Sequence, residues 1–115
     1  MPQIDDLSKK IIAFRNARNW KQFHKPKDLA ISLMLEAAEV AEHFQWKSEA
    51  EIKTHLEKHR DELGDELADV LYWVLLMSHD FKIDIYKALE NKLRSNEKKY
   101  PVSKSINRHE KYTKL

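Results

Sequence analysis

The chain contains a single glycine, and that scarcity restricts its fold more than any other feature. With 1 Gly and 3 Pro among 115 residues, few positions favour tight turns. A β-sandwich or barrel needs a turn about every 8–12 residues, so an all-β fold is excluded. The glycine-rich loops that bind dinucleotides or cradle phosphates need at least two glycines, so both motifs are excluded. We therefore expect a mostly helical chain.

Composition narrows the class of protein. Charged residues make up 35% and hydrophobic residues 42%, a mixture too apolar for a disordered chain. The absence of cysteine excludes disulfides and thiolate metal sites. A net charge of +2 gives no reason to expect a nucleic acid polymer as partner. No apolar stretch approaches the ~18 residues of a membrane span, and no secretory signal is evident. We expect a cytoplasmic protein with a single domain over residues 1–115.

Apolar periodicity predicts four helices. The expected helices cover residues of about 4–19, 26–44, 48–81 and 84–99, and the last 14 residues are expected to be irregular. Pro26 suits the first position of a helix. Ser48 and Glu51 have the spacing of a capping box, and Asp84 suits an N-cap. A bend is expected near Gly64, because glycine costs about 1 kcal/mol inside a helix.

Two of these helices carry an acidic stripe within an apolar sequence. The stripes, with spacings of four, three and four, are Ser32, Glu36, Glu39 and His43, then Glu62, Glu66, Asp69 and Trp73. Asp69 is the only charged residue in LADVLYWVLLM, so we expect it to be partly buried. If the helices pack antiparallel, four carboxylates converge and require counter-cations. Mg²⁺ fits, because it binds carboxylates together with substrate phosphates. The alternatives are a solvated stripe for Glu36 and Glu39, and a salt bridge for Asp69.

Other chemistries find less support in the sequence. There is no Glu-x-x-His pair for a di-iron site and no His-Glu-x-x-His zinc motif. His55 and His59 are four residues apart, but the lysines and arginine around them indicate a solvated face. From Asn91 onward the chain has 8 Lys or Arg against 2 Glu, a net charge of +6. That end suits a metal-bound polyphosphate or is simply a solvated tail.

The acidic motifs resemble those of a known family. Glu36-x-x-Glu39 followed by Glu66-Leu-Ala-Asp69 resembles the paired motif of the MazG-like nucleotide pyrophosphohydrolases. The flanking segments 18–29, 44–47, 96–102 and 111–115 look like those of its dCTP pyrophosphatase branch, so the resemblance extends over residues of about 11–115. It implies an all-α, four-helix bundle-like subunit. It also implies a homodimer or homotetramer with the site near a subunit interface.

The same resemblance implies an activity and a set of site residues. The implied reaction is Mg²⁺-dependent hydrolysis of a nucleoside triphosphate, foremost dCTP or a modified dCTP, to the monophosphate and pyrophosphate, with Mn²⁺ as a substitute. The implied metal ligands are Glu36, Glu39, Glu66 and Asp69. Glu36 or Glu39 would accept a proton from the attacking water as the catalytic carboxylate. The implied substrate-binding residues are Trp20, His24, Trp46, Trp73, Lys92 and Asn96. For the tryptophans, the alternative is a place in the core or in a subunit interface.

Two other functions remain open from the residues alone. One is a non-catalytic helical interaction module whose acidic stripe contacts a basic partner. Such a module would show binding that weakens with salt and no metal-dependent hydrolysis. The other is a related pyrophosphohydrolase acting on a different nucleotide, such as a damaged nucleotide or a phosphoribosyl-ATP-like compound.

Overall fold

The computed structural model describes residues 2–115, which form helices and connecting loops with no strand among them. The all-α fold class predicted from the sequence is thereby confirmed. The chain divides into two compact units, one extending to Lys82 and the other covering Ile83–Leu115. None of the helices within residues 2–115 has the length and apolar character needed to cross a membrane.

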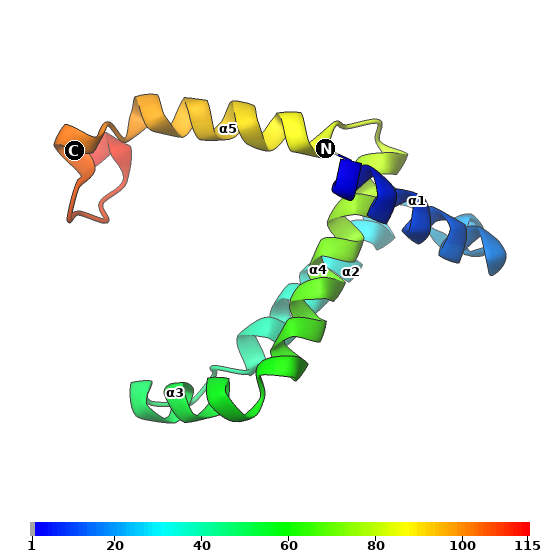
Figure 1. The fold of residues 1–115 in the computed structure, drawn as a ribbon, viewed down its shortest axis with the longest axis horizontal. Helices are drawn as coiled ribbons and strands as arrows, with labels where there is room; N and C mark the ends of the chain where they lie inside the picture. Colours follow the sequence, from blue (N-terminus) through cyan, green and yellow to red (C-terminus); the bar gives the residue numbers. More distant parts are fainter. Residues whose placement is uncertain (1) are drawn as a thin grey trace. The chain divides into compact units, whose positions relative to one another are not determined.

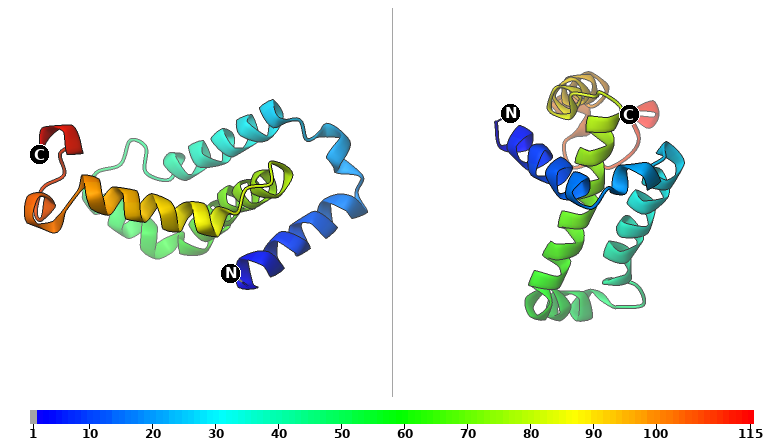
Figure 2. Two further views of the ribbon diagram at one scale, coloured as in Figure 1. Left: turned by 90° about the horizontal axis from the view of Figure 1, so that it is seen from above. Right: turned by 90° about the vertical axis from the view of Figure 1, so that its right-hand side faces the viewer.

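The first unit is built around two neighbouring antiparallel helices, α2 and α4 (Figures 1 and 2). Its elements are α1 (Pro2–Ala17), the 3-10 helix η1 (Trp20–Phe23), α2 (Pro26–Glu42), α3 (Glu49–Lys58) and α4 (Arg60–Asp80). The side chains of Leu29, Leu75 and Leu76 are almost completely buried, so the small core lies between α2 and α4. The first helix, α1, packs against the C-terminal part of α4.

Several helix boundaries follow the chemistry predicted from the sequence. Pro26 begins α2. The Ser48 hydroxyl accepts a hydrogen bond from the Glu51 N–H, and the Glu51 carboxylate accepts one from the Ser48 N–H, which completes the capping box. The Asp84 carboxylate accepts a hydrogen bond of 3.1 Å from the Lys87 N–H at the start of α5. These three predictions are confirmed.

The prediction of one long helix over residues 48–81 is wrong. The chain breaks at His59, where φ is −120° and ψ is 29°, and α3 and α4 are separate helices. The charges explain the position of the break: α3 ends on His55 and Lys58, and α4 begins with Asp61 and Glu62. Each helix therefore has charges that complement its own dipole. Gly64 lies inside α4, with open space where a side chain would project.

The second unit comprises α5 (Ile85–Lys99), α6 (Val102–Ser105) and the 3-10 helix η2 (Tyr112–Lys114). The sequence predicted that the last 14 residues are irregular. The structure differs, because two short helices lie within them. The Tyr100 hydroxyl accepts a hydrogen bond of 3.1 Å from the Tyr112 N–H, and the two rings meet edge to face at 5.9 Å. The Lys99 ammonium lies 4.9 Å from the Tyr112 ring centre, so cation–π attraction adds to this closure.

A buried ion pair joins α1 to the end of α4. The Arg15 side chain is 1% exposed, and its two terminal nitrogens donate to the two carboxylate oxygens of Asp80 at 2.7 and 2.9 Å. This two-point geometry fixes orientation as well as distance. Its hydrogen bonds and positive charge lower the pKa of Asp80 against the opposing effect of burial.

Replacement of Arg15 should therefore destabilise the first unit. Arg15→Met leaves a largely buried carboxylate without its partner, and we expect the free energy of unfolding to fall by about 3–5 kcal/mol. Urea denaturation measures this change. Arg94→Met is the control, because Arg94 is exposed and its hydrogen bond goes to Asn91 on the same helix.

The pair also sets a dependence on acid. Because the folded-state pKa of Asp80 is lowered, the stabilisation is complete above the ordinary aspartate pKa of 3.8 and is lost as pH falls through the lowered value. The wild-type stability should drop more steeply below about pH 4 than that of Arg15→Met. Equal acid dependence in the two proteins would contradict this account.

Candidate active site

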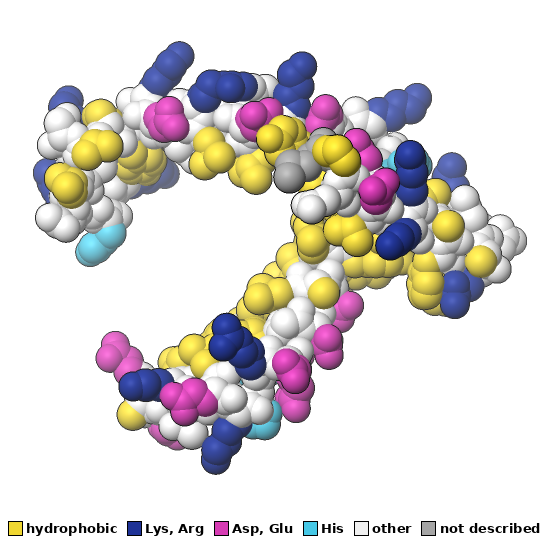
Figure 3. Space-filling model, viewed as in Figure 1, with side chains coloured by type: hydrophobic (Ala, Val, Ile, Leu, Met, Phe, Trp, Pro, Cys, Tyr) yellow, Lys and Arg dark blue, Asp and Glu magenta, His cyan; other side chains and the backbone are white. Residues whose placement is uncertain are grey.

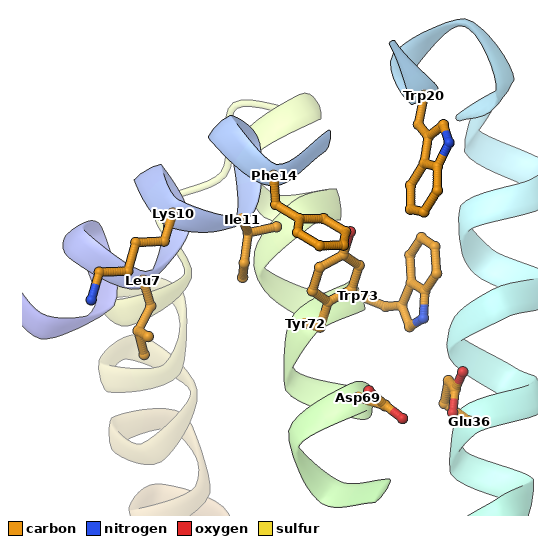
Figure 4. Close-up of a pocket in the computed structure, with 9 residues that line it drawn as sticks. All are labelled: Leu7, Lys10, Ile11, Phe14, Trp20, Glu36, Asp69, Tyr72 and Trp73. Carbon is orange, nitrogen blue, oxygen red and sulfur yellow. The ribbon is translucent and has the colours of Figure 1, made fainter. Parts of the chain in front are cut away.

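Three carboxylates from two helices form an acidic cluster: Glu36, Glu39 and Asp69. Glu36 and Glu39 project from one face of α2, because residues three apart on a helix are neighbours. Asp69 faces them from α4, and Figure 4 shows its carboxylate turned toward that of Glu36. One carboxylate oxygen from each of the three residues lies within 4.8 Å of the others. The antiparallel packing of α2 and α4 thus brings together three of the four predicted ligands.

The electrostatics of the acidic cluster centre on Glu36. Burial raises the pKa of Glu36, and a hydrogen bond with Glu39 and the negative charges of Glu39 and Asp69 raise it further. A hydrogen bond from the Trp73 side chain opposes this change. The Glu36 Oε2 atom is buried and has no hydrogen-bond partner among the described residues. The cluster is therefore short of positive charge and of hydrogen-bond donors.

These residues fit a hard divalent cation. Mg²⁺ binds carboxylate oxygens octahedrally at 2.0–2.1 Å, so adjacent ligands of one ion lie about 3 Å apart and opposite ligands about 4.2 Å apart. Oxygens that lie within 4.8 Å of one another would have to approach by up to about 2 Å to become adjacent ligands of one ion, a change within reach of side-chain rotation. The buried, unpartnered oxygen of Glu36 is the kind of atom that such an ion would satisfy.

Glu66, the fourth predicted ligand, is directed elsewhere. Its Oε2 atom contacts Nε2 of His43, which ends α2. Glu66 is three residues before Asp69 on α4, so it lies one helical turn from the acidic cluster. In the sequence, His43 follows Glu39 by four residues in the acidic stripe. This spacing was the feature that could have indicated a contact between His43 and a carboxylate of the facing helix.

The burial predicted for Asp69 is wrong. Asp69 is exposed, because it lines a pocket between the helices and does not point into the core. Its isolation among apolar residues has a different cause: the residues around it supply the apolar wall of that pocket and the contacts of α4 with α1 and α2.

An aromatic pocket of about 530 Å³ adjoins the acidic cluster (Figure 4). It is lined by Leu7, Lys10, Ile11, Phe14, Trp20, Glu36, Asp69, Tyr72 and Trp73. The acidic end is formed by Glu36 and Asp69, and the rest is mostly apolar. A ligand with a flat apolar part and an anionic part held through a cation would match both ends.

The pocket wall contains residues that the sequence analysis did not assign to the site. Phe14 contacts Trp20 and Tyr72 edge to face, at 5.7 and 6.4 Å between ring centres. The Arg18 guanidinium lies 3.7 Å from the centre of the Phe14 ring. The apolar repeat of Leu7, Ile11 and Phe14 marked one face of α1, but the repeat alone does not distinguish a pocket wall from a core face.

The remaining predicted site residues fall in different places. The ring centre of His24 lies 5.6 Å from that of Trp73. Burial, followed by the charge of Arg15, lowers the pKa of His24, and Asp80 opposes this change. Trp46 lies in the loop after α2, is 91% exposed and does not line the pocket. Lys92 and Asn96 lie one turn apart on α5, in the second unit.

The solvated face predicted for His55 and His59 is wrong for His55. His55 Nε2 lies 2.6 Å from His43 Nδ1, and the half-buried His55 ring stacks on that of His59 at 4.6 Å. His59 Nδ1 in turn lies 3.3 Å from Glu62 Oε2. The break at His59 turns α3 so that His55 faces the end of α2, which a continuous helix would not allow.

The fold and site together define a class: an all-helical protein with a carboxylate cluster on two facing helices beside an aromatic pocket. Residues 31–115 match the sequence profile of the MazG-like family. The dCTP pyrophosphatase 1 of Rattus norvegicus is 36% identical, over 99% of this chain and 68% of the rat protein. The Homo sapiens protein of the same name is 32% identical over the same shares. A crystal structure of a pyrophosphatase from Archaeoglobus fulgidus has 37% identity and a TM-score of 0.81, and the match covers 86% of this chain and 93% of that one. The chain belongs to the MazG-like family.

Repulsion within the acidic cluster should be measurable as stability. Asp69→Asn removes one of three facing negative charges, so we expect the free energy of unfolding to rise by about 0.5 kcal/mol in the presence of a chelator. Asp65→Asn is the matched control, because Asp65 is exposed on the same helix and is not in the cluster. Thermal denaturation of both variants checks the effect. A loss of stability in Asp69→Asn, or an equal gain in Asp65→Asn, would contradict it.

Proposed function

We propose that this protein hydrolyses dCTP, or a modified dCTP, to the monophosphate and pyrophosphate in a Mg²⁺-dependent reaction. The protein is a nucleoside triphosphate pyrophosphohydrolase, as its family and its dCTP pyrophosphatase relatives indicate. The choice of deoxycytidine nucleotides draws on the names of those relatives. Mg²⁺ is proposed from the chemistry of the acidic cluster, and Mn²⁺ is expected to substitute.

One observation carries the proposal: the acidic cluster and the aromatic pocket share Glu36 and Asp69. A nucleoside triphosphate has a flat base at one end and a polyanion at the other. With the base among the aromatic rings, the triphosphate would extend toward the carboxylates. A polyanion does not approach carboxylates without cations between them, which is why a metal is part of the proposal.

Each group in this arrangement has a definite task. The bound metal would neutralise charge on the phosphate oxygens and on the leaving pyrophosphate. Glu36, whose pKa is raised by its surroundings, or its neighbour Glu39 accepts the proton from the attacking water. Trp73 lines the pocket together with Glu36, and its side chain acts against the rise in the pKa of Glu36. Trp20, Phe14 and Tyr72 present ring surfaces to the base.

We assign supporting tasks to the other predicted residues. His24 packs against Trp73 and restricts the position of that ring. Lys92 and Asn96, on the same face of α5, are proposed to contact phosphate and sugar. Glu66 is proposed as a further metal ligand, one turn from the acidic cluster.

A second copy of the chain is also part of the proposal, as a homodimer or homotetramer. Large apolar side chains remain exposed on α2 and α4: Met34 is 61% exposed, Leu35 56% and Leu67 51%. Figure 3 shows hydrophobic side chains gathered on the surface of these helices. Trp46, 91% exposed, would be covered by the same association. Burial of such apolar surface is the main force in subunit association.

The activity is tested with a panel of substrates. Purified protein is incubated with Mg²⁺ and each NTP and dNTP, and monophosphate and pyrophosphate are quantified. We expect dCMP and pyrophosphate from dCTP, loss of turnover on chelation, and recovery with Mg²⁺ or Mn²⁺. Asp69→Ala should lower the rate at least about 100-fold, because a catalytic metal would lose a direct ligand, whereas Asp65→Ala should keep it.

Each other outcome removes a stated part of the proposal. Hydrolysis of other nucleotides only would reject deoxycytidine specificity and retain the site. Release of inorganic phosphate without pyrophosphate would reject the reaction type. No turnover of any nucleotide by folded protein would favour the interaction module with an acidic stripe.

The association of chains is tested separately by size-exclusion chromatography with light scattering, which measures the mass of the eluted protein. We expect a mass of two or four chains at micromolar concentration. Leu35→Lys with Leu67→Lys should shift the mass toward one chain, because two charges would be buried in the proposed interface. Circular dichroism shows whether the variant keeps its helices. A wild-type protein that elutes as a single chain would contradict the proposal.

A further inference from the structure

The contact between Glu66 and His43 continues into a chain of three side chains. His43 is almost completely buried at the end of α2, and both of its ring nitrogens are engaged. Its Nε2 contacts Glu66 Oε2 on α4, and its Nδ1 lies 2.6 Å from Nε2 of His55 on α3. Side chains from three helices therefore meet at one imidazole ring, outside the aromatic pocket.

Hydrogen-bond chemistry limits which atoms of this chain of side chains can donate. The contact between His43 and Glu66 meets the distance of an ion pair, while Glu66 Oε2 is a buried oxygen without a geometrically formed hydrogen bond among the described residues. An ionised carboxylate has no hydrogen to donate, so a hydrogen at this contact belongs to Nε2 of His43. In the contact between Nδ1 of His43 and Nε2 of His55 one nitrogen donates and the other accepts, and the tautomers of the two rings decide which does which. Burial, followed by the charges of His59, Lys47 and His43, lowers the pKa of His55, which agrees with a neutral ring at this position.

We infer that His43, oriented by His55, is a positioning residue that holds Glu66 for the metal of the acidic cluster. This inference rests on the proposed function, in which Glu66 is a ligand. A carboxylate with one oxygen held by His43 has its other oxygen left for a cation, and its side-chain rotation is restricted. Partners of this kind commonly orient metal ligands, and their loss typically costs 10–100-fold in metal affinity.

The position of Glu66 explains why a contact with the His43 ring would help it to bind a metal. Glu66 is one turn from Asp69, so its carboxylate has to be held at a definite angle to share an ion with the cluster. Glutamate loses more side-chain freedom than aspartate when it is fixed, and a contact made before binding reduces that loss at the time of binding. His43 supplies the contact, and His55 fixes the ring of His43.

The test measures Mn²⁺ affinity of the full chain without nucleotide. Free Mn²⁺ is quantified by electron paramagnetic resonance during titration. His43→Leu should weaken binding at least about tenfold, and His43→Gln, whose amide can still donate to Glu66, should stay within about threefold of wild type. His55→Leu should weaken binding several-fold, and His55→Gln should restore it. His79→Gln is the matched control, because His79 is exposed at the other end of α4.

A second readout separates positioning from a general loss of structure. Long-range ¹H–¹⁵N spectra of the metal-free protein should show a hydrogen on Nε2 of His43, the nitrogen that contacts Glu66. Melting temperatures of all variants are recorded without metal. If His43→Leu does not fold, the comparison of His55→Leu with His55→Gln decides the question.

The outcomes distinguish this inference from the proposed function. Wild-type protein that does not bind Mn²⁺ overturns the metal site itself. Wild-type binding with unchanged affinity in folded His43→Leu, or in His55→Leu where His43→Leu does not fold, overturns the positioning role and leaves the metal site standing. A His43 ring protonated at Nδ1 alone also overturns it.

Discussion

The ion pair between Arg15 and Asp80 determines where α1 lies, and the aromatic pocket depends on that position. The first unit has little buried apolar surface to fix its helices: Leu29, Leu75 and Leu76 are the nearly inaccessible hydrophobic side chains within its described residues. A two-point charged contact at 2.7 and 2.9 Å supplies the orientation that so small a core cannot. Phe14 is the residue before Arg15, so the pair also fixes the ring that meets Trp20 and Tyr72.

The acidic cluster adds a second constraint on the packing of α2 and α4. Repulsion between its carboxylates acts against the helix contact that brings them together. α2 and α4 gain stability from apolar contact, but that contact brings like charges within 4.8 Å. Burial, followed by a hydrogen bond with Glu39 and the charges of Glu39 and Asp69, raises the pKa of Glu36. The Glu36 Oε2 atom also has no hydrogen-bond partner among the described residues. Unfavourable charge of this kind is typical of functional sites, where a bound ligand supplies the positive charge and the contacts that the folded chain lacks. Rigid helices keep the carboxylates in place more precisely than loops would.

The sequence predicted what depends on spacing along one helix, and it failed where contacts join different helices. The i, i+3 pairs placed Glu36, Glu39 and Asp69 on facing stripes, and local cap chemistry predicted the start of α2, α3 and α5. Arg15 and Asp80 are 65 residues apart, and nothing in their local sequences indicates that they meet. The sequence predicted partial burial of Asp69, and this prediction failed because periodicity does not distinguish a core face from a pocket wall.

The break at His59 shows how a boundary that periodicity misses can matter for the site. If α3 and α4 were one continuous helix, the four residues from His59 back to His55 would extend the axis of α4 by about 6 Å. His55 would then lie beyond the end of α2. The break lets α3 leave that axis, and the loop after α2 then brings His55 within 2.6 Å of His43. The basic end of α3 and the acidic start of α4 favour two helices over one. The same charges that end a helix thus place an imidazole behind the ring that contacts Glu66.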